Sequence, residues 1–323
     1  MEPHAAIVGA GVIGSAWAAR FALHGIDVKI SDPNPDAPRI VDEVLANARR
    51  AWSDLGLPEP HEGSISIVDS IEEAVAGAMH VQESAPENPA LKVPILEQIA
   101  AACPFDTVIA SSTSGIKPSD LQPTITGPER MVVGHPYNPV YLVPVVEVVG
   151  GAQTSPVAID TAMATYERIS MKPVHVRVEI DAFIGDRLLE AVWREALWLV
   201  NDGVATTEEI DEVIRYGFGL RWAQMGLFET YRIAGGEGGM AHFIRQFGPC
   251  LEWPWTKLMD VPELTEDLVE TIADQSDAQS GGRSIRELER IRDRNLAGIM
   301  RSLEANDWGA GQTLKAQRRR LRD

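Results

Sequence analysis

Near the N-terminus the chain reads Gly9-Ala10-Gly11-Val12-Ile13-Gly14, directly after the apolar run Ala5-Ala6-Ile7-Val8. Glycines at this spacing, between a strand pattern and a helix pattern, are typical of the turn that binds a dinucleotide pyrophosphate. They permit a tight turn, a close approach of the backbone to the phosphates, and close packing of the helix on the sheet. The N-terminus of that helix favours anions. We therefore expect the cofactor to contact Gly9, Gly11, Val12, Ile13 and Gly14.

An acidic residue, Asp32, follows at the end of the second strand pattern, Val28-Lys29-Ile30-Ser31. A carboxylate at this position accepts hydrogen bonds from the adenosine ribose hydroxyls and repels a 2′-phosphate. The motif alone is also compatible with an ordinary glycine-rich turn, but strand, glycines, helix and acid agree here. The sequence therefore predicts an NAD site rather than an NADP site.

The composition is that of an ordinary globular protein. The 323 residues are enough for two domains, and 45% of them are hydrophobic and 24% charged. We find no signal-peptide pattern and no apolar run of membrane-spanning length. The two cysteines form no disulfide framework, and neither they nor the seven histidines show metal-ligand spacing. We expect a cytoplasmic protein without a metal.

The charge is strongly acidic and uneven. The net charge is −18, yet residues 283–323 carry 11 Lys and Arg against 6 Asp and Glu. An acidic body argues against a nucleic-acid partner and mildly favours a cationic small molecule. The basic tail Arg318-Arg319-Arg320-Leu321-Arg322 is compatible with a nucleic-acid arm. More often such a stretch is a solvated helix end.

Strand and helix patterns alternate up to about residue 180, with helical patterns at 40–56 and 88–102. This alternation predicts a parallel sheet with helices on both faces, a Rossmann-type doubly wound α/β domain over residues 1–180. The expected strands are 5–9, 27–31, 65–68, 80–84, 107–110, 131–134, 145–149 and 173–178.

From Asp181 onward helical periodicity dominates, which predicts an all-α C-terminal domain over residues 181–323. Thr206 and Glu209 have the spacing of a capping box at the start of a helix. A connector rich in glycine and aromatic residues is expected over 217–256, before a last long helix from Ile285 to Leu303.

The first helix of this domain is apolar over a wide stripe from Phe183 to Leu199, with Trp193 and Trp198 added. A small domain leaves much of such a stripe uncovered. The stripe therefore predicts a homodimer.

The next cluster with chemical potential is Gly134-His135-Pro136-Tyr137-Asn138-Pro139, followed by Glu147 inside the apolar run 145–149. A buried carboxylate needs a partner, and a carboxylate beside a histidine fixes its tautomer and stabilises the imidazolium. The alternative is a structural histidine and a glutamate on a wet sheet face. A nucleotide site upstream favours the chemical interpretation, because hydride removal from an alcohol also needs a base for its proton.

Two polar groups follow neighbouring strands at the same predicted edge. They are Ser111-Ser112-Thr113-Ser114-Gly115 and Glu83-Ser84-Ala85-Pro86-Glu87-Asn88, with Lys92 one helical turn beyond the second. Helix capping is the alternative role for each group.

These motifs, ESAPEN-x3-K, ASSTSG and GHP-x-NP-x3-VP-x2-EV, resemble the 3-hydroxyacyl-CoA dehydrogenase family. The resemblance covers the first 180 residues and continues through Asp181–Gly217. It implies that His135 is the catalytic base, that Glu147 orients it, and that Ser114 and Asn138 hydrogen-bond the reacting oxygen and the ring. It further implies that NAD is contacted by Asp32, Glu87 and Lys92.

Two departures from the family concern the substrate. Acyl-CoA members have a longer, lysine-rich hairpin after the second strand that meets the CoA phosphates. Here the stretch is short, and its cations are Arg39, Arg49 and Arg50. Where those members carry a Gly-Tyr-Pro-Met-Gly-Pro-like turn, this chain has Phe218-Gly219-Leu220-Arg221-Trp222-Ala223. An arginine there suits a free carboxylate, which indicates a small 3-hydroxy acid.

The phrases GHPYNPVYLVPVVEVVGG and RWAQMGLFETYRIAGGEGGMAHF are most similar to the family members that act on L-carnitine. The resemblance implies NAD-dependent oxidation of its 3-hydroxyl to 3-dehydrocarnitine. Arg221 is then expected to hold the carboxylate, and aromatic faces, including Tyr137 and Trp222, to face the trimethylammonium group. The other aromatic candidates are Trp193, Trp198, Phe228, Tyr231, Trp253 and Trp255.

Three alternatives stay open. L-gulonate and a short-chain 3-hydroxyacyl-CoA would undergo the same chemistry, but a sugar acid needs many hydrogen-bond donors, in which this region is not rich. The third is a non-catalytic, structural NAD-binding protein. The presence of both His135 and Glu147 argues against it.

Overall fold

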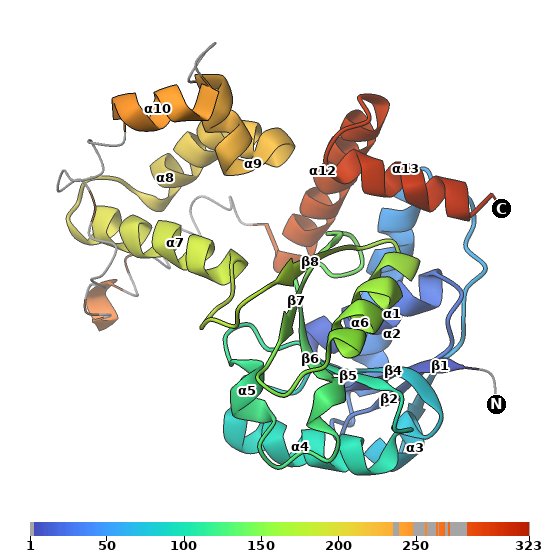
Figure 1. Ribbon diagram of the computed structural model, residues 1–323. Coiled ribbons are helices and arrows are strands. Elements are labelled where there is room, and N and C mark those ends of the chain that lie inside the picture. Colours follow the sequence, from blue (N-terminus) through green and yellow to red (C-terminus); the bar gives the residue numbers. More distant parts are fainter. Residues whose placement is uncertain are drawn as a thin grey trace. The chain divides into compact units, whose positions relative to one another are not determined.

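The computed structural model describes residues 3–234, 239–247, 256, 263, 265–268, 271 and 283–322. The chain forms two compact units (Figure 1). The first consists of Met1–Asp186 together with Arg290–Asp323, and the second is Arg187–Glu289. The sequence-based division assigned all of 181–323 to the helical domain. In the structure the end of the chain belongs instead to the first unit.

The first unit is built on one eight-stranded sheet with the order β3-β2-β1-β4-β5-β6-β7-β8. Each of the eight predicted strands is present, with boundaries shifted by at most two residues. The strands are β1 (His4–Val8), β2 (Val28–Ser31), β3 (Ile65–Val68), β4 (Ala78–Glu83), β5 (Val108–Ser111), β6 (Met131–Pro136), β7 (Val145–Gly150) and β8 (Lys172–Val176).

One strand pair departs from the expected parallel arrangement. β6 and β7 are antiparallel, whereas the other neighbouring pairs are parallel. The physical reason is the length of the connection, because residues 137–144 are too few for the crossover that parallel neighbours require. The sheet is therefore mostly parallel, in agreement with the predicted fold class, and the reversal at this pair has consequences for the site.

Helices cover both faces of the sheet, as predicted. One core contains large side chains of α1, α2 and α6, among them Trp17, Phe21 and Tyr166, and the other core contains Leu96 and Ile99 of α4. The helices of this part of the chain are α1 (Val12–Leu23), α2 (Ala37–Asp54), α3 (Ile71–Val75), α4 (Pro89–Ala102), α5 (Pro118–Leu121), the 3-10 turn Pro128–Arg130 and α6 (Pro156–Arg168).

The last two helices, α12 (Ile285–Ala305) and α13 (Ala310–Arg320), are tied to the first unit by side chains. The Tyr141 hydroxyl donates to Asp293 of α12 over 2.6 Å. Arg318 of α13 donates to the carbonyls of Leu55 and Gly56, at the end of α2. A guanidinium suits this position because the last carbonyls of a helix lack backbone partners. The basic tail thus contributes at least one arginine to tertiary structure.

The second unit is helical in its described part. The capping box predicted for α8 is confirmed, because Thr206 Oγ1 accepts from Glu209 N and the Thr206 N–H donates to the Glu209 side chain. The predicted connector is helical over α9 and α10. The helices are α7 (Gly185–Asn201), whose first residues lie in the first unit, α8 (Thr207–Val213), the π-helical turn Ile214–Phe218, α9 (Gly219–Ala234) and α10 (Gly239–Phe247).

A helix that spans a membrane must be both long and apolar. Among the described residues, no helix meets both requirements.

Candidate active site

The candidate residues meet at one edge of the sheet. β1, β2, β4, β5 and β6 run parallel, so their carboxyl ends lie at the same edge. The strand order reverses between β1 and β4, and open α/β sheets bind ligands at such a point. The glycine turn follows β1, Asp32 follows β2, and His135 lies near the end of β6.

The glycine turn is tightly packed on its sheet side and open on the other. Gly9 has a φ of +99°, and a Cβ there would lie 2.7 Å from the carbonyl oxygen of Ser84. A Cβ on Gly14 would lie 1.8 Å from the carbonyl oxygen of Gly9. At Gly11, by contrast, a Cβ would meet nothing within 4 Å, and Val12 beside it is 60% exposed. The turn therefore fits a pyrophosphate, which needs close backbone approach at Gly11.

Asp32 is held against this turn. One carboxylate oxygen accepts from the Ala10 N–H over 2.5 Å, and the other accepts from the Asn34 N–H over 2.7 Å. The hydrogen bond from Ala10 ties the loop after β2 to the glycine turn, and the one from Asn34, within that loop, orients the carboxylate. The carboxylate is thereby oriented where the motif predicts a contact with ribose.

The loops after β4 and β5 are joined by Glu87. Its Oε1 accepts from the Thr113 hydroxyl over 2.5 Å and from the N–H groups of Ser114 and Gly115 over 3.1 and 3.2 Å. The sequence predicted Glu87 as an NAD contact. The structure adds that Glu87 shapes the loop that carries Ser114.

Lys92 lies beneath these loops, with a side chain that is 1% exposed. Its ammonium donates to the fully buried carboxylate of Glu83 over 3.0 Å and to the Ala85 carbonyl over 2.9 Å. A buried ammonium requires such partners. A direct contact of Lys92 with NAD stays a prediction, while the contacts of Lys92 within the protein hold the loop after β4.

The antiparallel register of β6 and β7 sets His135 directly opposite Glu147. His135 Nδ1 lies 2.9 Å from Glu147 Oε2, and both side chains are buried. The two residues that the sequence paired are therefore in contact, and the strand reversal positions them.

Glu147 is saturated with donors. Besides His135, its carboxylate accepts from the Tyr137 hydroxyl over 3.2 Å and from the N–H groups of Ile184 and Gly185 over 3.0 and 3.1 Å. Burial alone would raise the pKa of Glu147, but the hydrogen bonds from His135, Ile184 and Gly185 outweigh it and hold the pKa below its ordinary value. An ionised carboxylate only accepts, so Nδ1 of His135 carries a proton and Nε2 is the nitrogen that can exchange one.

The segment before α7 closes over this pair. Ala182 and Phe183 have φ values of 59° and 47°, and the buried Phe183 ring lies 5.7 Å from the His135 ring. A Cβ on Gly185 would overlap the Tyr137 hydroxyl oxygen, at 1.1 Å. The two amides on Glu147 were not predictable from the sequence, because backbone donors leave no side-chain signal. The glycine after Phe183-Ile184 was the one available hint.

A second acidic residue was also missed. Asp186, in the first turn of α7, has its Oδ2 4.0 Å from Nε2 of His135. The signal that could have found it is an acidic residue one position after Gly185, at the start of the long predicted helix.

The other predicted site residues are placed as follows. The side chains of Ser114 and Asn138 are exposed, and neither hydrogen-bonds His135 or Glu147 in the described chain. Arg221 and Trp222 lie on α9 in the second unit, where Trp222 packs 4.5 Å from the ring of Phe218. Trp253 and Trp255 lie outside the described residues.

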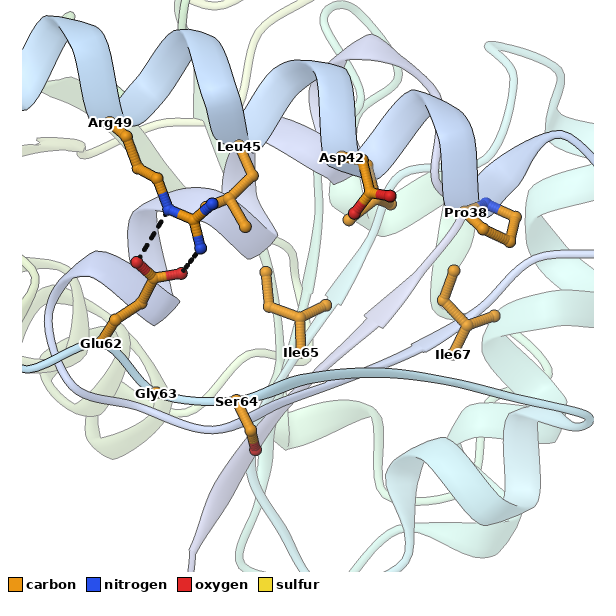
Figure 2. A pocket seen from close by; sticks show the side chains of 10 residues that line it. Pro38, Asp42, Leu45, Arg49, Glu62, Gly63, Ser64, Ile65 and Ile67 are labelled. Atoms are coloured by element: carbon orange, nitrogen blue, oxygen red, sulfur yellow. Dashed lines mark hydrogen bonds and ion pairs between the residues drawn. The ribbon is translucent and has the colours of Figure 1, made fainter.

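A pocket of about 530 Å³ lies elsewhere, between α2 and the edge strand β3 (Figure 2). Arg49 and Glu62 form an ion pair across it, with a shortest distance of 2.5 Å. No candidate catalytic residue lines it. The other lining residues are Pro38, Val41, Asp42, Leu45, Gly63, Ser64, Ile65 and Ile67.

Fold and site together define a dinucleotide-binding α/β protein with a buried His–Glu pair near the nucleotide turn. Residues 4–180 match the family model described as 3-hydroxyacyl-CoA dehydrogenase, NAD binding domain. Residues 183–275 match the model described as 3-hydroxyacyl-CoA dehydrogenase, C-terminal domain. The chain belongs to the 3-hydroxyacyl-CoA dehydrogenase family, and its N-terminal part is an NAD-binding domain.

Similar proteins agree with this assignment. The chain is 62% identical, over 98% of its length, to an L-carnitine dehydrogenase/betainyl-CoA thioesterase of Agrobacterium fabrum, and it spans 65% of that protein's length. It is 57% identical to an L-carnitine dehydrogenase of Mesorhizobium japonicum, covering 98% of this chain and 89% of the relative. A solved structure of 5-formyl-3-hydroxy-2-methylpyridine 4-carboxylic acid 5-dehydrogenase is 31% identical, with a TM-score of 0.80, covering 94% and 99% of the two chains.

Proposed function

We propose that this protein oxidises the 3-hydroxyl of L-carnitine to 3-dehydrocarnitine with NAD. The observation that carries the chemistry is the buried His135–Glu147 contact of 2.9 Å at the nucleotide-binding edge of the sheet. The names of the relatives from Agrobacterium fabrum and Mesorhizobium japonicum support the substrate.

In the proposed mechanism, Nε2 of His135 takes the proton of the 3-hydroxyl as the C–H bond breaks. Glu147 stabilises the imidazolium that forms, since its carboxylate already faces Nδ1. Ser114 and Asn138 are proposed to position the substrate oxygen. NAD, when bound, supplies the nicotinamide ring that accepts the hydride. The glycine turn and Asp32 are proposed to hold it, and Glu87 and Lys92 to support or contact it.

The cations after β2 favour a small substrate over an acyl-CoA. Arg49 forms a bidentate pair with Glu62, at 2.5 and 3.0 Å. Arg39 pairs with Glu43 at 2.8 Å, and Arg50 donates to Asn47. A CoA phosphate would have to compete with these partners. For the substrate carboxylate we propose Arg221, and for the trimethylammonium group the faces of Tyr137 and Trp222.

The test is NADH formation with L-carnitine, L-gulonate, 3-hydroxybutyrate and 3-hydroxybutyryl-CoA. We expect the highest kcat/KM with L-carnitine. A higher kcat/KM with L-gulonate or with the CoA ester would make that compound the substrate and leave the proposed NAD-dependent oxidation unchanged. NAD binding without turnover of any of them would favour a structural role instead.

We further propose a homodimer. Leu188, Leu189, Val192 and Trp193 of α7 are 39–60% exposed, and no residue of α7 is buried in the described chain. Such an apolar helix face suits a two-fold contact. Trp193→Glu should lower the molar mass measured by light scattering from dimer to monomer. Arg194→Glu, one position on, should not. A monomeric unmodified protein would refute the proposal.

A cytoplasmic location is the remaining part of the proposal. Cys103 is a buried free thiol, and the sequence contains one further cysteine, Cys250. A chain with so few cysteines does not depend on an oxidising compartment.

A further inference from the structure

The reactive nitrogen of His135 has a second carboxylate beside it. Glu147 occupies Nδ1 at 2.9 Å, and Asp186 Oδ2 lies 4.0 Å from Nε2, the nitrogen that exchanges the proton. The side chain of Asp186 is 29% exposed, whereas those of His135 and Glu147 are 5% and 4% exposed. Of the two carboxylates beside His135, that of Asp186 is thus the more accessible to solvent.

The position of Asp186 is built into the fold. The N–H groups of Ile184 and Gly185 donate to Glu147, and Phe183 before them is fully buried. The Ala182 N–H donates to the carbonyl of Gly115, in the loop after β5. Asp186 follows this pinned segment directly, and a carboxylate in the first turn of a helix is favoured by the helix dipole.

The aromatic ring of Tyr137 is in contact with the same histidine. The Tyr137 ring is 5.2 Å from the His135 ring, and its hydroxyl is tied to Glu147. Burial raises the pKa of Tyr137, and the charge and hydrogen bond of Glu147 and the charge of Asp186 add to this effect, so the hydroxyl stays protonated and neutral. A carboxylate and an aromatic face suit a quaternary ammonium, which has no N–H to donate and is attracted by charge and by π-faces.

We propose that Asp186 determines the preference for a cationic substrate, an inference that rests on the proposed oxidation of L-carnitine. In L-carnitine the carbon that bears the ammonium is bonded directly to the carbinol carbon. When the hydroxyl donates to Nε2, the cation therefore lies within Coulombic reach of Asp186. The same charge repels a carboxylate, so it orients the substrate with the ammonium toward Asp186 and the carboxylate away from it.

The test compares two substrates in steady-state NADH formation. One is L-carnitine, and the other is its neutral isostere with a tert-butyl group in place of trimethylammonium. Asp186→Asn keeps the shape and removes the charge. We expect it to lower kcat/KM for L-carnitine by roughly 10- to 100-fold, mainly through KM, and to change kcat/KM for the isostere by less than about threefold. Asp186→Glu, which restores the charge, should recover much of the preference.

Asp181→Asn is the matched control. Asp181 lies in the same segment, 85% exposed and 3.8 Å from Lys117, and its substitution should leave the substrate ratio unchanged. Equal loss with both substrates in Asp186→Asn would overturn the inference, because Asp186 would then act on the base or on the fold. If the unmodified protein formed no NADH with L-carnitine, the proposed function would be overturned, and this inference with it.

Discussion

In the proposed mechanism, the chemistry depends most directly on His135. Its Nδ1 faces Glu147 at 2.9 Å, so the loss of the ring removes the group that is proposed to take the hydroxyl proton. His135→Ala should lower kcat by roughly 10²–10⁴-fold, the usual contribution of a positioned base, while the Kd for NAD changes little. Kinetics and NAD titration measure the two effects separately.

His175→Ala is the control for this substitution, since His175 is an exposed histidine on β8. It should leave both kcat and Kd unchanged. If His135→Ala kept most of the activity, the base would have to be another group.

Also at the scale of a single residue, Asp32 is proposed to determine the preference for NAD over NADP. Its carboxylate is held beside the glycine turn by the N–H groups of Ala10 and Asn34. NAD should be preferred over NADP by more than about tenfold in kcat/KM, or about 1.4 kcal/mol, because the carboxylate repels a 2′-phosphate. Asp32→Ala should narrow this ratio, and Asp36→Ala, on the exposed start of α2, should not. Equal use of both cofactors by the unmodified protein would contradict the assignment.

The start of α7 is the element on which the site geometry depends. Gly185 lies so close to Tyr137 that Gly185→Ala must displace the tyrosine or the helix start, and with it the donors on Glu147. We expect a loss of about 1–3 kcal/mol in the free energy of unfolding, typical of overpacking, together with a lower kcat. Urea denaturation and steady-state kinetics measure these changes.

The control for α7 is Gly298→Ala in α12, where a Cβ would meet nothing within 4 Å. It should be neutral or stabilising by up to about 1 kcal/mol. A double variant tests the cause, because Tyr137→Ala removes the obstructing ring. In the Tyr137→Ala background, Gly185→Ala should then change the free energy of unfolding only slightly. If the full loss of stability persisted in that background, its cause would be something other than the contact between Gly185 and Tyr137.

For the molecule as a whole, two histidines link stability to pH, the fully buried His80 and the partly buried His24. Burial lowers the pKa of His24 from 6.5 to about 3 and that of His80 from 6.5 to about 4. Below pH 6.5 the unfolded chain therefore binds more protons than the folded one, so stability is lost as the pH falls. Between pH 7 and pH 5 each histidine should lower the free energy of unfolding by about 2 kcal/mol.

His80→Phe isolates one of these contributions. The phenylalanine ring can keep the contacts with Phe21 and Tyr166, whose ring centroids lie 5.7 and 5.4 Å from His80, and it cannot titrate. Urea denaturation at both pH values should show the acid-dependent loss reduced by about half, with His24 accounting for the remainder. An unchanged loss would mean that His80 is not protonated on unfolding.

Local patterns were enough for much of the molecule. The strands, the glycine turn with Asp32, and the capping box at Thr206 were all predicted, because alternation, helical spacing and turn residues act over a few neighbouring positions. The His135–Glu147 pairing was also predicted, from the chemistry that a buried carboxylate requires and from the family resemblance.

Only tertiary structure determined the rest. The amides of Ile184 and Gly185 on Glu147, Asp186 beside Nε2, and the return of α12 and α13 to the first unit join residues far apart in the chain. Such contacts depend on the strand order, on the reversal at β7 and on which polar groups lie next to each helix end in the folded chain. No sequence periodicity predicts these contacts. A backbone N–H, or a single carboxylate at the start of a helix, has the same sequence pattern whether or not it lies at the His–Glu pair.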